Sequence, residues 1–204
     1  MWSRIRLSDY KWIRVHLARR VGHLRADAQE NQDRILEAAA RAFGHDGSDT
    51  SLKAIAHAAG VGIATLYRRF PAREDLIEAT YRSETARLTG SADELLARMA
   101  PDAALREWME RFVDYTLTKN GMAEALPAIL ASRAGLRVHS RDLLRAAIDR
   151  MLRAAVAAGT LRADVPADDV MMAVGGVTLI AGHEHQRELA SRLLDLVVAG
   201  LRPL

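Results

Sequence analysis

Apolar residues recur at helical spacing along most of the chain, and the clearest case lies within residues 50–73. From Ser51 to Ala59 they fall at i, i+3, i+4 and i+7, which is the spacing of a helix with one buried stripe. These apolar positions are Leu52, Ile55, Ala56 and Ala59. The pattern therefore predicts a short helix over residues 51–59.

A turn is expected directly after this helix. Gly60 follows the last periodic residue, and glycine adopts positive φ without steric cost, so it can end a helix. Val61 is expected in the core beneath the turn. Gly62 stands where a second helix must begin, a position at which glycine is tolerated.

The second helix is predicted over Ile63–Phe70. Leu66 and Phe70 are four residues apart and share one face, which leaves the small, polar and basic residues directed elsewhere. Pro71 ends the helix, because a proline forces the preceding residue out of the helical region. Two short helices joined through a glycine form a helix-turn-helix, whose second helix lies in the major groove of DNA.

Helical patterns also flank this motif. Before it, an apolar stripe begins near Asn31 and ends at the Gly44–Gly47 turn; its residues are Ile35, Ala38, Ala39, Ala42 and Phe43. We expect this helix to brace the motif through Ile35, Ala39 and Phe43, packed against Ile55, Leu66 and Phe70. A fourth helix is predicted to start after Pro71, with Arg73, and to run to about Leu88, with Gly90 and Ser91 kinking or ending it.

The remaining residues read as a second all-helical unit. Its predicted helices are 92–99, 103–119, 122–132, 140–158, about 166–181 and 186–199. Pro127 is expected to kink or split the third of these. The helix ending at Ala181 is apolar nearly all round, so it must be buried on more than one side.

Length and composition fit this plan. The 204 residues are half apolar, which suffices for a sizeable core in one large or two small domains. The chain has no cysteine, which excludes a disulfide framework and a thiolate metal site. No run reaches the roughly 18 apolar residues of a membrane span, and no secretory signal is evident. We expect a cytoplasmic protein with no membrane partner.

Positive charge is concentrated at the start of the chain. Residues 1–30 hold seven Lys/Arg against three Asp/Glu, whereas the whole chain carries a net charge of +3. Basic arms ahead of DNA-binding folds contact phosphates or the minor groove. The alternatives are a flexible extension without function or, for the first 20 or so residues, a translation start placed too early. We predict a basic, flexible arm over residues 1–28.

Three ordered motifs carry a resemblance to a known family. They are IL.AAARAF...G from Ile35 to Gly47, T.L..IA..AGV from Thr50 to Val61, and TLYRRF..RE.L from Thr65 to Leu76. Through them the chain resembles the TetR/AcrR family of bacterial regulators over residues 29–90. The resemblance implies an all-α fold of about nine helices: a helix-turn-helix DNA-binding domain (29–88, motif 51–70), then a helical effector-binding and dimerisation domain (89–204).

Candidate DNA contacts follow from side-chain chemistry. Lysine and arginine donate to guanine, and a threonine methyl meets a thymine methyl, so Lys53, Thr65 and Arg69 are candidates for base edges. Ile63 and Ala64 would add apolar contact. Thr50, Ser51, Tyr67 and Arg73 are candidate phosphate contacts. Arg68 is a further candidate, and for each exposed charge the alternative is a solvated surface residue. Gly62 and Ile63 replace residues that are often polar in the family, so base preference does not transfer.

The resemblance also implies an effector site and a dimer. In such regulators a small molecule binds the second domain, where the adaptable apolar and aromatic residues are Trp108, Met109, Phe112, Tyr115, Met122, Met151 and Met172. These residues are equally suited to a core. The family dimerises through its last two helices, here about 166–200, where Gly175 and Gly176 permit close approach. The alternative is that these helices complete a monomeric core.

Signals for other functions are weak. Gly60-x-Gly62 follows a helix and lacks the third glycine of a dinucleotide loop. His183 and His185 diverge on a helix, so we expect a surface pair rather than a metal site. No catalytic motif or cofactor signature appears. An all-helical enzyme and a DNA-coating protein without effector remain alternatives to the expected function, a dimeric repressor that binds a near-palindromic operator and is released by a small molecule.

Overall fold

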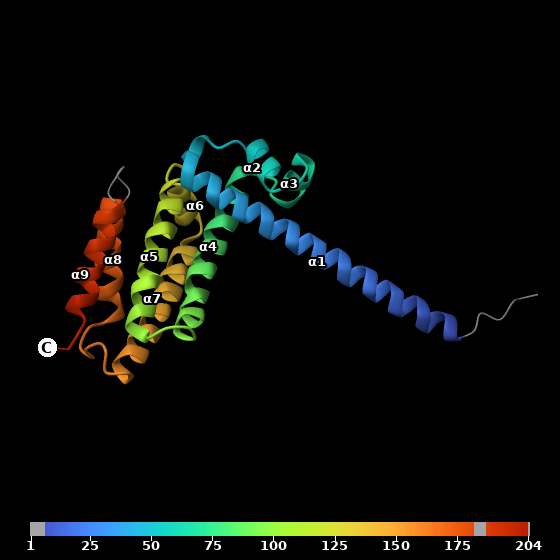
Figure 1. Cartoon of the computed structure of the whole chain (residues 1–204). Coiled ribbons are helices and arrows are strands. Elements are labelled where there is room, and N and C mark those ends of the chain that lie inside the picture. Colours follow the sequence, from blue (N-terminus) through green and yellow to red (C-terminus); the bar gives the residue numbers. More distant parts are fainter. Residues whose placement is uncertain (1–6, 182–186, 204) are drawn as a thin grey trace, which may run out of the picture.

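The computed structural model describes residues 7–181 and 187–203, and this part of the chain is all-α (Figure 1). A 3₁₀ turn, η1 (Gly47–Asp49), follows the first of its nine α-helices. The helices are α1 (Leu7–Asp46), α2 (Leu52–Ala58), α3 (Ile63–Arg69), α4 (Arg73–Leu96), α5 (Pro101–Asn120), α6 (Leu126–Ser132), α7 (Ala134–Ala157), α8 (Ala167–Ala181) and α9 (Arg187–Gly200).

The end of α1 packs with α2 and α3 to form the head of the molecule. Ile35, Ala39 and Phe43 are buried, as are Ile55, Leu66 and Phe70, the residues they were predicted to meet. All six belong to one hydrophobic cluster. Burying a large apolar side chain contributes about 1.5–3 kcal/mol, so these residues hold two short helices that would not be stable alone.

The second domain is a bundle around α4, α5 and α7. The α8–α9 hairpin packs on α5 and α7, on the side of the bundle away from the head (Figure 1). Trp108, Met109 and Ile148 are among the largest fully buried side chains here. Helix α4 starts in the head and continues into the bundle, so it joins the two domains.

The first helix begins much earlier than predicted. It starts at Leu7 rather than near Asn31, so helix replaces the expected flexible arm over residues 7–28. No proline occurs before Pro71, and between Leu7 and Gly44 the only glycine is Gly22, so little in the sequence interrupts helical hydrogen bonding. The N-terminal half of α1 projects past α3 (Figure 1). Residues 1–6 of the predicted arm lie outside the described residues.

Three other boundaries differ from prediction. Helix α4 is not broken at Gly90 and Ser91, and the Ser91 hydroxyl donates to the Leu88 carbonyl, so helix crosses the expected domain boundary at residue 88. Pro127 lies in the first turn of α6, where its missing N–H costs nothing, and the preceding residues form turns. Helix α7 begins at Ala134 rather than Ser140.

Candidate functional site

The turn between α2 and α3 has the geometry that the sequence predicted. Gly60 has a φ of +65°, the left-handed conformation that suits glycine. The Gly60 N–H donates to the His57 carbonyl and the Val61 N–H donates to the Ala56 carbonyl, each at 3.0 Å. This pair of bonds satisfies the last carbonyls of α2 and fixes the direction in which α3 leaves it.

Helix α3 presents an outward face around one buried anchor. Leu66 is fully buried, whereas Ile63 is 40% exposed and Tyr67 is 49% exposed. Ala64, Arg68 and Arg69 are also exposed. Because the buried residue lies on one side of a two-turn helix, most of the other side is free to meet a partner.

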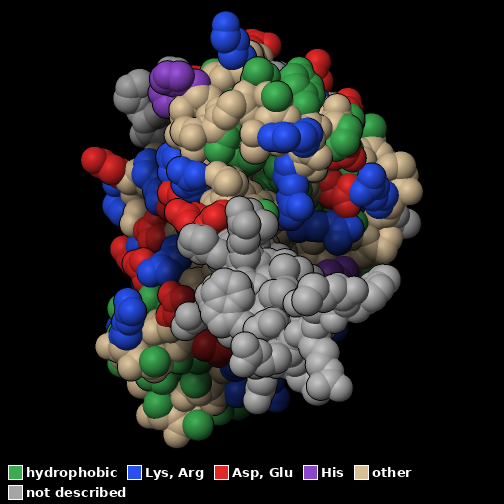
Figure 2. Space-filling model, turned by 90° about the vertical axis from the view of Figure 1, so that its right-hand side faces the viewer, with side chains coloured by type: hydrophobic (Ala, Val, Ile, Leu, Met, Phe, Trp, Pro, Cys, Tyr) green, Lys and Arg blue, Asp and Glu red, His purple; other side chains and the backbone are tan. Residues whose placement is uncertain are grey.

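Side chains near this face are partly held in place. Thr65 is half-buried, and its hydroxyl accepts a hydrogen bond from Arg68 Nη2 at 3.0 Å. Ser51 caps α2, since its hydroxyl accepts from the Ala54 N–H at 3.1 Å. Lys53 is exposed on the first turn of α2. Figure 2 shows Lys and Arg side chains beside hydrophobic ones on the upper part of the molecule, viewed from the α3 side.

Two predicted phosphate contacts have roles inside the head. Thr50 is 5% exposed, and its hydroxyl donates to the Ala42 carbonyl at 3.1 Å. Arg73 Nη1 donates to the Thr50 carbonyl at 2.7 Å, and the guanidinium lies 5.5 Å from the centre of the Phe43 ring. Both residues tie the segment before α2 to its neighbours, and a phosphate contact by either stays a prediction.

Most of the predicted effector contacts lie in the core of the second domain. Six of the seven are buried, namely Trp108, Met109, Phe112, Tyr115, Met122 and Met151. The remaining one, Met172, is 65% exposed on α8. The structure therefore does not bring all seven to one place.

The polar atoms of the buried aromatics are already satisfied. Trp108 Nε1 donates to the Leu88 carbonyl at 2.9 Å, and the Tyr115 hydroxyl lies 3.1 Å from the Thr85 hydroxyl. Burial, together with Tyr81, raises the pKa of Tyr115 far above its usual value and keeps it neutral. A ligand would have to displace these interactions, so effector contacts at these residues stay a prediction.

An open groove lies elsewhere, between the end of α5, α6 and the start of α7. Its volume is about 640 Å³, within the usual range for small-molecule sites. Lys119, Ala123, Leu126, Leu130, Arg137 and Val138 are among its lining residues. Sequence reasoning missed Lys119 and Arg137, although two cations flanking an apolar stretch are a signal that could have drawn attention to them.

Helices α8 and α9 leave apolar residues in solvent. Met172 and Leu179 of α8 are 65% and 74% exposed, and Leu196 of α9 is 67% exposed. On α8, nothing lies within 4 Å of where a side chain on Gly175 or Gly176 would begin. An apolar surface of this kind on one chain is typical of an interaction site.

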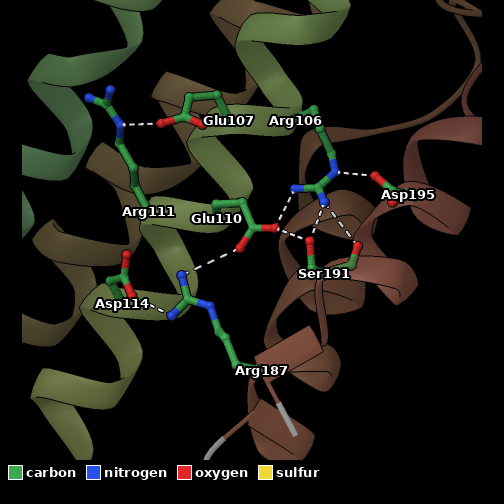
Figure 3. Close-up of polar contacts among 8 residues, drawn as sticks. All are labelled: Arg106, Glu107, Glu110, Arg111, Asp114, Arg187, Ser191 and Asp195. Carbon is green, nitrogen blue, oxygen red and sulfur yellow. Dashed lines mark hydrogen bonds and ion pairs between the residues drawn. The ribbon is translucent and has the colours of Figure 1, made fainter. Parts of the chain in front are cut away.

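A polar network holds α9 against α5 (Figure 3). Arg106 forms ion pairs with Glu110 at 2.8 Å and with Asp195 at 2.6 Å, and it also donates to Ser191. Burial alone would raise the pKa of Glu110, but the hydrogen bond from Ser191 and the charge of Arg106 outweigh it and lower the pKa. Arg187 adds a pair with Asp114 at 2.5 Å.

Two other classes of site find no support within the described part of the chain. No helix there combines the length and apolar character that crossing a bilayer requires. Among the residues whose side chains the structure describes, no group of three or more His, Asp or Glu is placed to hold a metal ion. His183 and His185, predicted to form a surface pair, lie outside the described residues.

Comparison with family models matches both halves of the chain. Residues 35–80 match the model described as bacterial regulatory proteins of the tetR family. Residues 100–203 match the C-terminal domain described as transcriptional regulator SbtR-like. The comparison with curated proteins gave no significant match.

Solved structures give the same picture. The TetR transcriptional regulator SCO0520 from Streptomyces coelicolor is 49% identical, with 84% of this chain and 98% of that chain covered and a TM-score of 0.79. A TetR transcription regulatory protein from Mycobacterium vanbaalenii is 29% identical, with 88% of this chain and 99% of that chain covered and a TM-score of 0.72. LfrR from Mycobacterium smegmatis, solved in complex with proflavine, is 24% identical over 86% and 99%, with a TM-score of 0.63.

Proposed function

The chain belongs to the TetR family of DNA-binding transcriptional regulators, and we propose that it acts as a homodimeric repressor released from its operator by a small molecule. It has the family's N-terminal helix-turn-helix domain and an SbtR-like C-terminal domain. The family consists of regulators rather than enzymes.

The observation that carries the proposal is the uncovered face of α3. Ile63, Tyr67 and Arg69 are exposed there, while Leu66 anchors the helix beneath them. A helix held in this way can enter the major groove and offer cationic, aromatic and apolar contacts together. We assign contacts with DNA base edges to Lys53, Thr65 and Arg69, and contacts with DNA phosphates to Ser51 and Tyr67.

The exposed apolar face of α8 and α9 supports the dimer. Met172, Leu179 and Leu196 would leave water on pairing with the same residues of a second copy, because a two-fold interface uses one patch twice. Two linked heads read two half-sites about one helical turn apart, which gives the specificity that one short helix lacks.

Release by a small molecule requires that the ligand prefers one arrangement of the two heads. Binding energy shifts an equilibrium only through a difference in affinity between its two states. LfrR was solved in complex with proflavine, and we extend ligand binding to this chain as a proposal.

The basic N-terminal part of α1 is proposed to add contacts without sequence specificity. Residues 7–30 of this helix hold five Lys/Arg against three Asp/Glu, and the N-terminal half of α1 projects past α3 (Figure 1). Cations along phosphates release counterions, so their contribution falls as salt rises. Deleting this part should make operator binding less sensitive to salt.

The test is selection of bound fragments from the source genome, followed by footprinting. The proposal predicts a protected site with two inverted half-sites near a promoter. Equal recovery of unrelated fragments would instead indicate a general DNA-coating protein.

A further inference from the structure

We propose that the groove between α5, α6 and α7 binds an apolar carboxylate, and that this ligand is the effector of the proposed regulator. The groove is a site distinct from the buried aromatic core of the second domain. The regulatory role of the ligand rests on the proposed function, whereas its binding to the groove does not.

The walls of the groove are mainly apolar. Leu126 and Leu130 come from α6, Val138 from the first turns of α7, and Ala123 from the turn between α5 and α6. Val138 is 58% exposed, so its side chain is open to a ligand in the groove. Covering these side chains with an alkyl or aryl group removes apolar surface from water.

The charge of the groove selects the polar end of the ligand. Lys119 and Arg137 both line it, and neither side chain forms an ion pair or hydrogen bond with any other residue that the structure describes. No acidic residue is among those that line it. By contrast, Arg106, Arg150 and Arg187 in the same domain each pair with a carboxylate at 2.8 Å or less. Two unpaired cations beside an apolar wall complement a molecule with an anionic head and an apolar body.

The groove is connected to the DNA-reading head by two contacts. Arg133 follows the last residue of α6, and its guanidinium pairs with Glu78 of α4, a carboxylate buried in the helix that joins the domains. Gly121, two residues after Lys119, packs so closely on α1 that a side chain there would overlap the Phe43 backbone. A ligand that moves α6 therefore acts on α4, and one that moves the end of α5 acts on α1.

Calorimetry on the full-length protein tests the binding. The probes are octanoate, dodecanoate and 1-naphthoate, with 1-octanol as the uncharged match for octanoate. We expect at least one carboxylate to bind, octanol to bind at least tenfold more weakly than octanoate, and the double variant Lys119→Gln/Arg137→Gln to weaken carboxylate binding about tenfold or more. Arg98→Gln, an exposed arginine beyond the end of α4, is the matched control and should bind as wild type.

The results separate this inference from the proposed function. Failure of all three carboxylates to bind, or equal binding by the double variant, overturns the inference even if the protein binds an operator. If a carboxylate binds through the two cations, we further expect it to weaken operator binding by the wild-type protein and not by the double variant. Binding without that loss confirms the site and overturns its role as effector site, while failure to select any operator overturns the proposed function alone.

Discussion

Two uncovered surfaces of the molecule differ in their chemistry. The outward face of α3 carries Tyr67, Arg68 and Arg69, whereas the outward face of α8 and α9 carries Met172, Leu179 and Leu196. Both consist of side chains that the single chain leaves in solvent. The first suits a hydrated, anionic partner such as DNA, and the second suits burial against another apolar surface. Exposure alone therefore says little about a partner, and side-chain chemistry is what distinguishes the two surfaces.

The largest effect is expected from placing charge on the apolar face. Leu179→Glu combined with Leu196→Glu should give a monomer, because two carboxylates cannot be buried without partners. Linking two binding modules raises affinity by about 10²–10⁴, so operator binding should fall by about 100-fold or more. Sedimentation velocity and operator titration measure the two effects. Met99→Glu, at another exposed apolar residue, is the control, and a double variant that stays dimeric would remove this face from the interface.

The next prediction concerns the close contact between Gly121, after α5, and the Phe43 backbone of α1. Gly121→Ala should lower the free energy of unfolding by about 1–3 kcal/mol, because its methyl group would overlap the Phe43 backbone and force α5 from α1. Gly90→Ala is the matched control. Its methyl group meets open space in the middle of α4, so it should stabilise the protein by about 0.5–1 kcal/mol. Chemical denaturation of both variants measures these changes. If Gly121→Ala were as stable as the wild type, the contact between Gly121 and Phe43 would not be tightly packed.

On the DNA side, Arg69→Ala should weaken operator binding by about 1–3 kcal/mol and reduce discrimination between bases. Competition between the operator and a scrambled duplex measures both effects. Arg98→Ala removes an exposed arginine far from the head and should change neither. An equal loss on scrambled DNA would reassign Arg69 from base edges to phosphates.

A smaller loss, about 1 kcal/mol, is expected for Tyr67→Phe. The hydroxyl is proposed to donate to a phosphate, so the loss should be similar on every sequence. Titration against operator and unrelated duplexes gives the comparison. An unchanged affinity would exclude Tyr67 as a phosphate contact through its hydroxyl.

The smallest effect belongs to the network that holds α9 in place. Glu110→Gln should destabilise the protein by under about 1 kcal/mol at neutral pH, since this carboxylate is partly exposed. The pKa of Glu110 is lower in the folded state than in the unfolded state, so its contribution is present above the unfolded pKa of about 4.3. It is lost as the pH falls through the folded pKa. The stabilities of variant and wild type should therefore converge as the pH falls below the unfolded pKa, and a difference that grows in acid would contradict this account.

The sequence predicts the reading head well because its determinants are local. Gly60 ends α2, Leu66 and Phe70 anchor α3, and all three lie within one short stretch, so periodicity and turn chemistry suffice. The structure confirms the all-α plan, and the family models confirm the family. The start of α1 was predicted wrongly because the irregular apolar pattern before Asn31 hides a segment whose backbone is nonetheless helical.

The groove between α5, α6 and α7 and the contact between Gly121 and Phe43 could not be predicted from local patterns. Lys119 and Arg137 line one hollow only because α5, α6 and α7 fold back on one another. The contact of Gly121 with Phe43 joins the end of α5 to the end of α1. Apolar and aromatic residues such as Trp108 suit both a pocket and a core, and only the packing shows that Trp108 fills the core here.

The central claim, that two linked heads read two half-sites, is tested most directly on the selected operator with one half-site scrambled. The account predicts a complex of two chains per intact operator. It also predicts that scrambling one half-site reduces affinity to near that of unrelated DNA, because the second head then loses its specific contacts. Unchanged affinity for the half-scrambled duplex, with one chain bound, would contradict it.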